Sequence, residues 1–160
     1  MRIGFGYDIH KTEEGSGIKL GGIDIECNYS FKAHSDGDVL IHAIIDGILG
    51  ALSKGDLGTF FPPDDDRWKD SSSEELLEIV LEKFSRKIRK FVNIDLIIKI
   101  EKPRIKPYQE EIKDNVGKLL HIGSKNINLK VKSGEGVGMV GEGLAVEAFA
   151  AILLEEDNEE

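Results

Sequence analysis

Three residues near the start of the chain have the types and spacing expected of a metal site. Asp8 and His10 are two residues apart, so on a β-strand both side chains would point to the same face. His42 lies in an apolar run that predicts a helix. One carboxylate and two imidazoles would give a tetrahedral zinc ion three ligands and leave its fourth position open for a substrate oxygen. The alternative is that each of the three is an ordinary hydrogen-bonded polar residue.

His42 needs a partner on the side of its ring that faces away from a metal. It interrupts an apolar helix face, where an unpaired imidazole is unfavourable. Asp38 and Asp46 lie four residues before and after it, on the same side of the helix. We therefore expect one of these carboxylates to hydrogen-bond to the ring and orient it.

Two other stretches carry residues suited to a phosphate or a cation. The segment His34–Asp38 lies at the start of the predicted helix, and helix starts bind phosphate through free backbone N–H groups. A turn with an N-cap is the commoner meaning of Ser-Asp-Gly-Asp, so both interpretations stay open. The run Asp64–Asp66 could hold a cation, although a solvated acidic loop is the more frequent meaning of such a run.

A glycine-rich loop lies near the C-terminal end of the sequence. Gly136, Gly138 and Gly141 match the spacing of the dinucleotide-binding motif. We reject that interpretation, because too few residues follow Gly141 for the helix, second strand and acidic ribose ligand of that fold. A loop whose backbone N–H groups approach a phosphate stays open, with Glu135 as a candidate ligand for a second metal ion.

Hydrophobic periodicity predicts the elements that must hold these residues. Strands are expected over 1–8, 93–100 and 127–132, and a hairpin over 17–26. Helices are expected over 36–52, from Ser72 or Ser73 to about 90, over 107–121 and over 144–154. Strands separated by helices predict an α/β or α+β layered fold, in which helices cover a mixed β-sheet. We expect one compact domain over 1–160, with 155–160 as a frayed acidic tail.

Composition narrows the classes of partner. The formal net charge of -9 argues against nucleic acid or an anionic membrane as the main partner. A phosphorylated substrate is still compatible, because bound metal ions reverse the local sign of charge. No apolar run reaches the roughly 18 residues of a membrane span, and no signal or transit peptide is expected before Arg2. Cys27 is the single cysteine, which excludes an internal disulfide and fits a cytoplasmic protein.

Six short segments together resemble one enzyme family. The matching segments are Arg2–His10, Ala33–Asp38, His42–Ala43, Gly55–Gly58, Phe61–Pro62 and Gly141–Ala145. In their order and spacing the chain resembles the 2-C-methyl-D-erythritol 2,4-cyclodiphosphate synthases of the non-mevalonate isoprenoid pathway. The resemblance implies a compact subunit, a homotrimer and active sites between neighbouring subunits.

The resemblance also implies roles for individual residues. Zinc would be held by Asp8, His10 and His42, and a second divalent ion, Mg²⁺ or Mn²⁺, by Glu135. His34 and Ser133 would stabilise the transition state. The residues implied to contact the cytidine diphosphate-linked substrate are Asp8, Ile9, His10, His34, Ser35, Asp56, Leu57, Gly58, Phe61, Pro62, Pro63, Asp64, Asp65, Ile100, Glu101, Lys102, Pro103, Arg104, Ile105, Lys106, Lys132, Ser133, Gly134 and Glu135.

The implied reaction is an intramolecular phosphoryl transfer. The 2-phosphate of 4-diphosphocytidyl-2-C-methyl-D-erythritol 2-phosphate attacks the β-phosphorus, expels CMP and closes a cyclic diphosphate. The nucleophile is already ionised, so positioning and charge neutralisation are what the protein must supply. A zinc hydrolase and a metal-bound, non-enzymatic trimeric binding module are the alternatives.

The chain departs from the family pattern in two places. Lys132-Ser133 stands where the family usually has two threonines. The stretch Met139–Gly143 is shorter than in the family and lacks its arginine, which lines a central trimer cavity. The resemblance therefore does not extend to isoprenoid diphosphate binding in that cavity.

Overall fold

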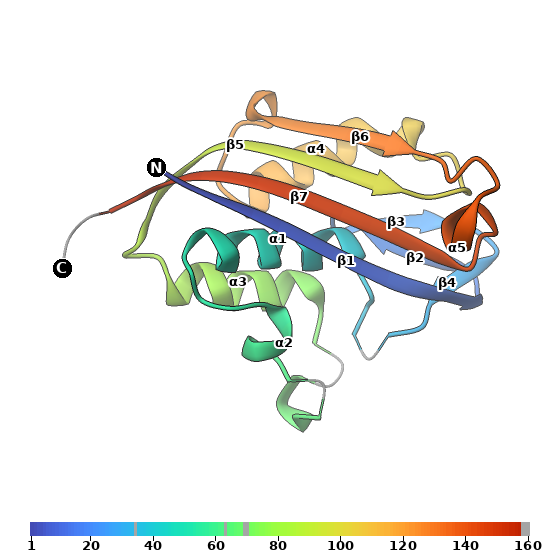
Figure 1. Cartoon of the computed structure of the whole chain (residues 1–160), viewed down its shortest axis with the longest axis horizontal. Helices are drawn as coiled ribbons and strands as arrows, with labels where there is room; N and C mark the ends of the chain where they lie inside the picture. The colour runs from blue at the N-terminus through green and yellow to red at the C-terminus, as the bar shows by residue number, and fades with distance from the viewer. Residues whose placement is uncertain (34, 63, 69–70, 158–160) are drawn as a thin grey trace.

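A five-stranded mixed β-sheet in the order β4-β1-β7-β5-β6 forms the centre of the molecule (Figure 1). The computed structural model describes residues 1–33, 35–62, 64–68 and 71–157. Strands β5 and β6 are parallel, and the other neighbours in this sheet are antiparallel. The strands are β1 (Arg2–Glu14), β4 (Tyr29–Phe31), β5 (Ile88–Lys99), β6 (Ile127–Lys132) and β7 (Ala145–Glu156), and a separate hairpin joins β2 (Gly17–Leu20) to β3 (Ile23–Glu26).

Helices cover one face of this sheet, as predicted (Figure 1). The longer ones are α1 (Val39–Ala51), α3 (Ser73–Lys83) and α4 (Gln109–Leu119). The short ones are α2 (Leu57–Phe60), α5 (Gly138–Gly141) and the 3-10 turns η1 (Asp66–Trp68), η2 (Lys106–Tyr108) and η3 (Ser124–Asn126). No helix in the described ranges is long and apolar enough to cross a membrane.

Helix α1 lies directly on β1, which brings the predicted metal ligands together. A Cβ atom added to Gly4 would lie 1.8 Å from the carbonyl oxygen of Gly47, and one added to Gly6 would lie 1.8 Å from that of Ala43. Glycine on the inner face of β1 therefore permits a backbone-to-backbone approach that no other residue allows. Asp8 and His10 continue the same strand, and His42 is on the turn of α1 that starts beside them.

The outer face of β1 is apolar and exposed. Ile3 and Phe5 keep 74% and 69% of their surface accessible, and Tyr7 and Ile9 are exposed as well. Phe149 of β7 packs against the rings of Phe5 and Tyr7 on this face. The outer face of the sheet thus presents a row of apolar side chains along β1.

The prediction of a helix over 144–154 was wrong, because this segment is β7, between β1 and β5. Alanine-rich sequence favours a helix locally. In the structure every second residue from Val146 to Leu154 is buried under the helices, and the others point to the outer face. Pairing with two strands has overridden the local preference, since β-structure depends on tertiary context.

Other boundaries were predicted with smaller errors. The hairpin over 17–26 and the strand over 127–132 are confirmed, and α1 begins after an N-cap at Asp38. The first strand runs on to Glu14, and the second long helix ends at Lys83, so the residues from Ile88 onward belong to β5.

The prediction of a frayed acidic tail over 155–160 was wrong for its first two residues. Glu155 and Glu156 end β7, and the Glu155 carboxylate contacts Arg89 and Lys90 at 2.9 and 3.0 Å. Residues 158–160 lie outside the described residues.

Candidate metal centre

Asp8 and His10 of β1 meet His42 of α1 with their ligand atoms within 4.8 Å of one another. The Asp8 Oδ2 atom is 3.0 Å from both His10 Nε2 and His42 Nδ1, and the two nitrogens are 3.3 Å apart. The imidazole rings meet edge to face, with 70° between their planes. The structure therefore brings together the three residues that the sequence analysis singled out, and each offers one atom to a common point.

Each histidine is held from behind by a different kind of partner. His10 Nδ1 lies 2.9 Å from the carbonyl oxygen of Gly37. A carbonyl oxygen only accepts, so His10 donates its Nδ1–H to Gly37 and presents Nε2 to Asp8. His42 Nε2 lies 2.9 Å from the hydroxyl of Ser73.

The prediction that Asp38 or Asp46 holds the ring of His42 was wrong. Asp38 is completely buried and accepts the backbone N–H groups of Gly21, Gly22 and Ile41 at 2.9, 2.7 and 3.0 Å. Burial raises the pKa of Asp38 to about 6, against the opposing effect of these three hydrogen bonds. Asp46 accepts the N–H of Leu57 at 2.8 Å, and burial raises its pKa. Both carboxylates therefore anchor backbone around the site.

The partner that the sequence analysis missed is Ser73. It was considered only as a helix cap, but Ser72 fills that role in a complete capping box with Glu75. Ser73 is then the first residue of α3, with its side chain turned to His42, 31 positions away in the chain. The one sequence signal was a run of three serines, Ser71–Ser73, where a cap needs a single one.

The donor set fits a divalent cation. Burial on its own would raise the pKa of Asp8, but hydrogen bonds and charge interactions with His10 and His42 outweigh it and hold that pKa below the usual range. Burial would lower the pKa of His10, and contact with Asp8 more than reverses this and raises it. The cluster thus attracts positive charge. A carboxylate and two imidazole nitrogens at these separations are the ligand types and number of an open zinc site.

The three ligand residues line the wall of a hollow of about 520 Å³. Besides Asp8 and His10, six predicted substrate-contact residues line the same hollow, namely Ser35, Leu57, Phe61, Pro62, Asp64 and Asp65. Asp56 caps α2 beside it by accepting the N–H of Thr59 at 2.8 Å, and Gly58 follows within that helix. His34 and Pro63 lie outside the described residues.

The predicted segments Ile100–Lys106 and Lys132–Glu135 form a second group, outside the lining of this hollow, and Ile9 is exposed on the outer face of β1. The N–H of Ile100 donates to the carbonyl of Lys132 at 2.8 Å, which joins the segment Ile100–Lys106 to the end of β6. The Glu101 carboxylate accepts the N–H of Gly134 at 2.8 Å. Ser133 donates its hydroxyl to Glu135 at 2.7 Å. The chain thus holds the predicted metal ligands and the predicted cytidine segment in two separate groups.

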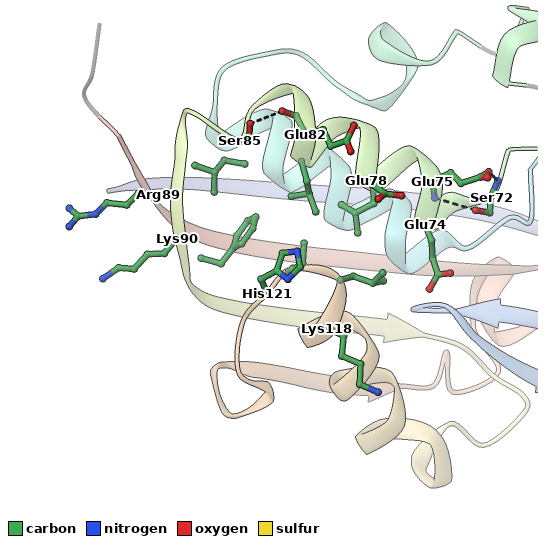
Figure 2. A pocket seen from close by; sticks show the side chains of 16 residues that line it. Ser72, Glu74, Glu75, Glu78, Glu82, Ser85, Arg89, Lys90, Lys118 and His121 are labelled. Atoms are coloured by element: carbon green, nitrogen blue, oxygen red, sulfur yellow. Dashed lines mark hydrogen bonds between the residues drawn. The ribbon is translucent and has the colours of Figure 1, made fainter.

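Another hollow lies elsewhere on the molecule. It is a groove of about 860 Å³ between α3, the start of β5 and the end of α4 (Figure 2). Glutamates of α3 form one side, and Arg89, Lys90 and His121 lie across from them (Figure 2). It contains none of the predicted site residues, so we place the chemistry at the smaller hollow, where three ligand atoms converge.

The chain is similar to known proteins over nearly its whole length. The YgbB family model matches residues 1–155. The 2-C-methyl-D-erythritol 2,4-cyclodiphosphate synthase of Treponema denticola is 48% identical over 96% of this chain and 96% of its own length. The structure of IspF from Plasmodium falciparum in complex with CDP is similar with a TM-score of 0.83, at 35% identity, over 98% of this chain and 97% of that one.

A longer protein contains the same fold. The bifunctional IspDF of Campylobacter jejuni matches with a TM-score of 0.91 at 31% identity, and the match covers 98% of this chain and 42% of that one. The matched family model spans nearly the whole chain, and the relative from Treponema denticola is 48% identical. The chain therefore belongs to the YgbB family, the family of the 2-C-methyl-D-erythritol 2,4-cyclodiphosphate synthases.

Proposed function

We infer that this protein converts 4-diphosphocytidyl-2-C-methyl-D-erythritol 2-phosphate to 2-C-methyl-D-erythritol 2,4-cyclodiphosphate and CMP. The single observation that carries the inference is the convergence of Asp8, His10 and His42 at a hollow, in a chain of this family. Two relatives named 2-C-methyl-D-erythritol 2,4-cyclodiphosphate synthase match over nearly their full length, and a similar structure is a complex with CDP. A cytoplasmic location stays a prediction.

The first task of the site is to hold polyanionic phosphates together. We assign zinc to Asp8, His10 and His42, and a second divalent ion, Mg²⁺ or Mn²⁺, to Glu135. Bound there, the two ions withdraw charge from phosphate oxygens, which is the main demand of phosphoryl transfer. This accounts for the use of a polyanionic substrate by a chain of net charge -9.

The second task is to fold a flexible substrate back on itself. Ser35 and the residues around Phe61 line the hollow beside the metal ligands, which suits them to the phosphate and methylerythritol parts. The segment Ile100–Lys106 is assigned to the cytidine, and Lys132–Glu135 to the diphosphate. Asp56–Gly58 complete the methylerythritol contacts, and His34 and Ser133 are the proposed stabilisers of the transition state. Orientation of this kind replaces a strong general base, because the attacking phosphate oxygen is already ionised.

We also propose a homotrimer with active sites between subunits. Two observations support it. On the outer face of β1, Ile3 and Phe5 form a contiguous exposed apolar patch, whereas ordinary surfaces carry apolar residues singly. The metal ligands and the cytidine segment form separate groups within one chain, so a neighbouring copy can supply the missing half of each site.

The test of the reaction is product analysis. Metal-replete protein incubated with the cytidyl substrate and Mg²⁺ is expected to release CMP and the cyclic diphosphate in equal amounts. Inorganic phosphate or an uncyclised product, identified by mass, would point to a zinc hydrolase instead. Binding of the substrate without turnover would point to a binding module.

A matched pair of histidine variants locates the reaction. His42→Asn removes one metal ligand, and His121→Asn changes a histidine in the distant groove. Asparagine tolerates the left-handed backbone of His121, whose φ is 52°. We expect His42→Asn to lose turnover and about one zinc per chain, and His121→Asn to keep both. Equal activity in the two variants would contradict the assignment.

A further inference from the structure

Ser73 is a completely buried hydroxyl between a metal-ligand candidate and a carboxylate. Its Oγ lies 2.9 Å from His42 Nε2 and hydrogen-bonds to Asp36 Oδ1. The other oxygen of Asp36 accepts the backbone N–H of Ser73 at 3.2 Å. The Asp36 carboxylate therefore accepts hydrogen bonds from both the hydroxyl and the backbone N–H of Ser73, the first residue of α3.

The direction of these hydrogen bonds follows from the inventory of protons. A carboxylate only accepts, and Asp36 already accepts N–H groups from Asp38 and Ser73. The single hydroxyl proton of Ser73 is therefore directed to Asp36. The Ser73 oxygen has only a lone pair left for His42, so the ring must donate Nε2–H. In the neutral ring, Nδ1 of His42 is then the nitrogen whose lone pair is available to a metal ion, and it lies 3.0 Å from Asp8 Oδ2.

We propose that Ser73 and Asp36 are positioning residues that hold His42 in its Nε2–H tautomer and so set the metal affinity of the site. This rests on the metal role assigned to Asp8, His10 and His42 above. His10 obtains the complementary tautomer from the carbonyl of Gly37, the residue next to Asp36. Two consecutive residues of one loop thus fix the tautomers of both imidazoles. Gly37 acts on His10 through its backbone carbonyl, and Asp36 acts on His42 through Ser73.

Zinc affinity is the first readout, measured by competition with a chelator on the whole protein. Ser73→Ala is expected to weaken zinc binding about 10- to 100-fold, the usual effect of removing a hydrogen-bond partner behind a ligating histidine. Ser72→Ala is the matched control, because it removes the N-cap of the same helix without a contact to His42. The control is expected to lower the melting temperature and to keep zinc affinity within about twofold of wild type.

Two further variants separate positioning from packing. Ser73→Thr keeps the hydroxyl and is expected to recover most of the zinc affinity. Asp36→Asn keeps the size of the side chain, but its amide can donate to Ser73. The Ser73 hydroxyl can then donate its proton to His42, so it no longer has to accept a hydrogen bond from that ring. It is expected to weaken zinc binding in the same direction as Ser73→Ala, and it tests the inference even if Ser73→Ala does not fold.

The tautomer itself is the second readout and needs no activity. Long-range ¹H–¹⁵N spectra of metal-free protein, recorded where His42 is neutral, are expected to show Nε2–H in wild type and a mixture of tautomers in Ser73→Ala. Wild-type zinc affinity in both Ser73→Ala and Asp36→Asn, or Nδ1–H in wild type, would overturn the inference. Wild-type protein that binds no zinc would instead overturn the metal site, so the two failures are distinguishable.

Discussion

The two faces of strand β1 differ in side-chain size, because small and large residues alternate along its sequence. On the inner face Gly4 and Gly6 remove every side-chain atom so that α1 can approach. On the outer face Ile3 and Phe5 present large apolar groups to the surface. The inner face positions the metal ligands within one chain, and the outer face is the surface that we assign to assembly. On the inner face, the close approach of α1 decides which residues fit. On the outer face, the evidence for a contact is the exposed apolar surface itself.

The largest effect is expected from filling the inner face. Gly6→Val places its first carbon 1.8 Å from the backbone oxygen of Ala43, so α1 must move away from β1. We expect a loss of more than about 3 kcal/mol in the free energy of unfolding, beyond ordinary overpacking. Urea unfolding followed by circular dichroism measures it. Near-wild-type stability would show that the position of α1 on β1 does not depend on glycine at position 6.

Asp38→Ala should have the next largest effect, because it removes the anchor of α1 at the site. Three backbone N–H groups, of Gly21, Gly22 and Ile41, would lose their acceptor. A buried unsatisfied group costs roughly 1–3 kcal/mol, so we expect a destabilisation of about 3 kcal/mol. Asp46→Ala, which frees a single N–H, is the control and should destabilise by about 1 kcal/mol. Equal losses in thermal unfolding would contradict the anchoring role.

Strand β7 allows the two faces to be compared at neighbouring residues. Ala150 is completely buried on the inner face, and Ala151 is half-buried on the outer face. Ala150→Val is expected to destabilise by about 1–3 kcal/mol through overpacking. Ala151→Val, measured at the same protein concentration, is expected to change stability by less than half as much. A reversed order in denaturant midpoints would mean that the inner face has room to spare.

The smallest effect on folding, and the largest on assembly, is expected at the outer face of β1. Replacing both Ile3 and Phe5 by serine removes apolar surface that the folded chain exposes. Such substitutions usually change folding stability by about 0.5 kcal/mol or less. Light scattering should show wild type at three times the 17.7 kDa chain mass and the variant at lower mass. A variant that remains trimeric would remove β1 from the interface.

The sequence predicted more of the site than of the sheet that carries it. Asp8, His10 and His42 could be found because ligand type and a two-residue spacing are local signals. Strand β7 could not, because its alanines favour a helix until two neighbouring strands pair with them. Ser73 was equally hidden. Its contact with His42 depends on how α3 packs on α1, and no periodicity in the chain encodes that contact.

The strand order has a consequence for the order of events during synthesis. Strand β1 is made first and β7 last, yet they pair from Arg2 with Leu154 to Lys11 with Ala145. β1 carries Asp8 and His10, and its only other pairing in the described chain is with the short β4. A nascent chain on the ribosome therefore cannot complete this sheet until β7 has emerged. Such long-range closure slows folding, so metal capture is expected to follow the pairing of β7 with β1.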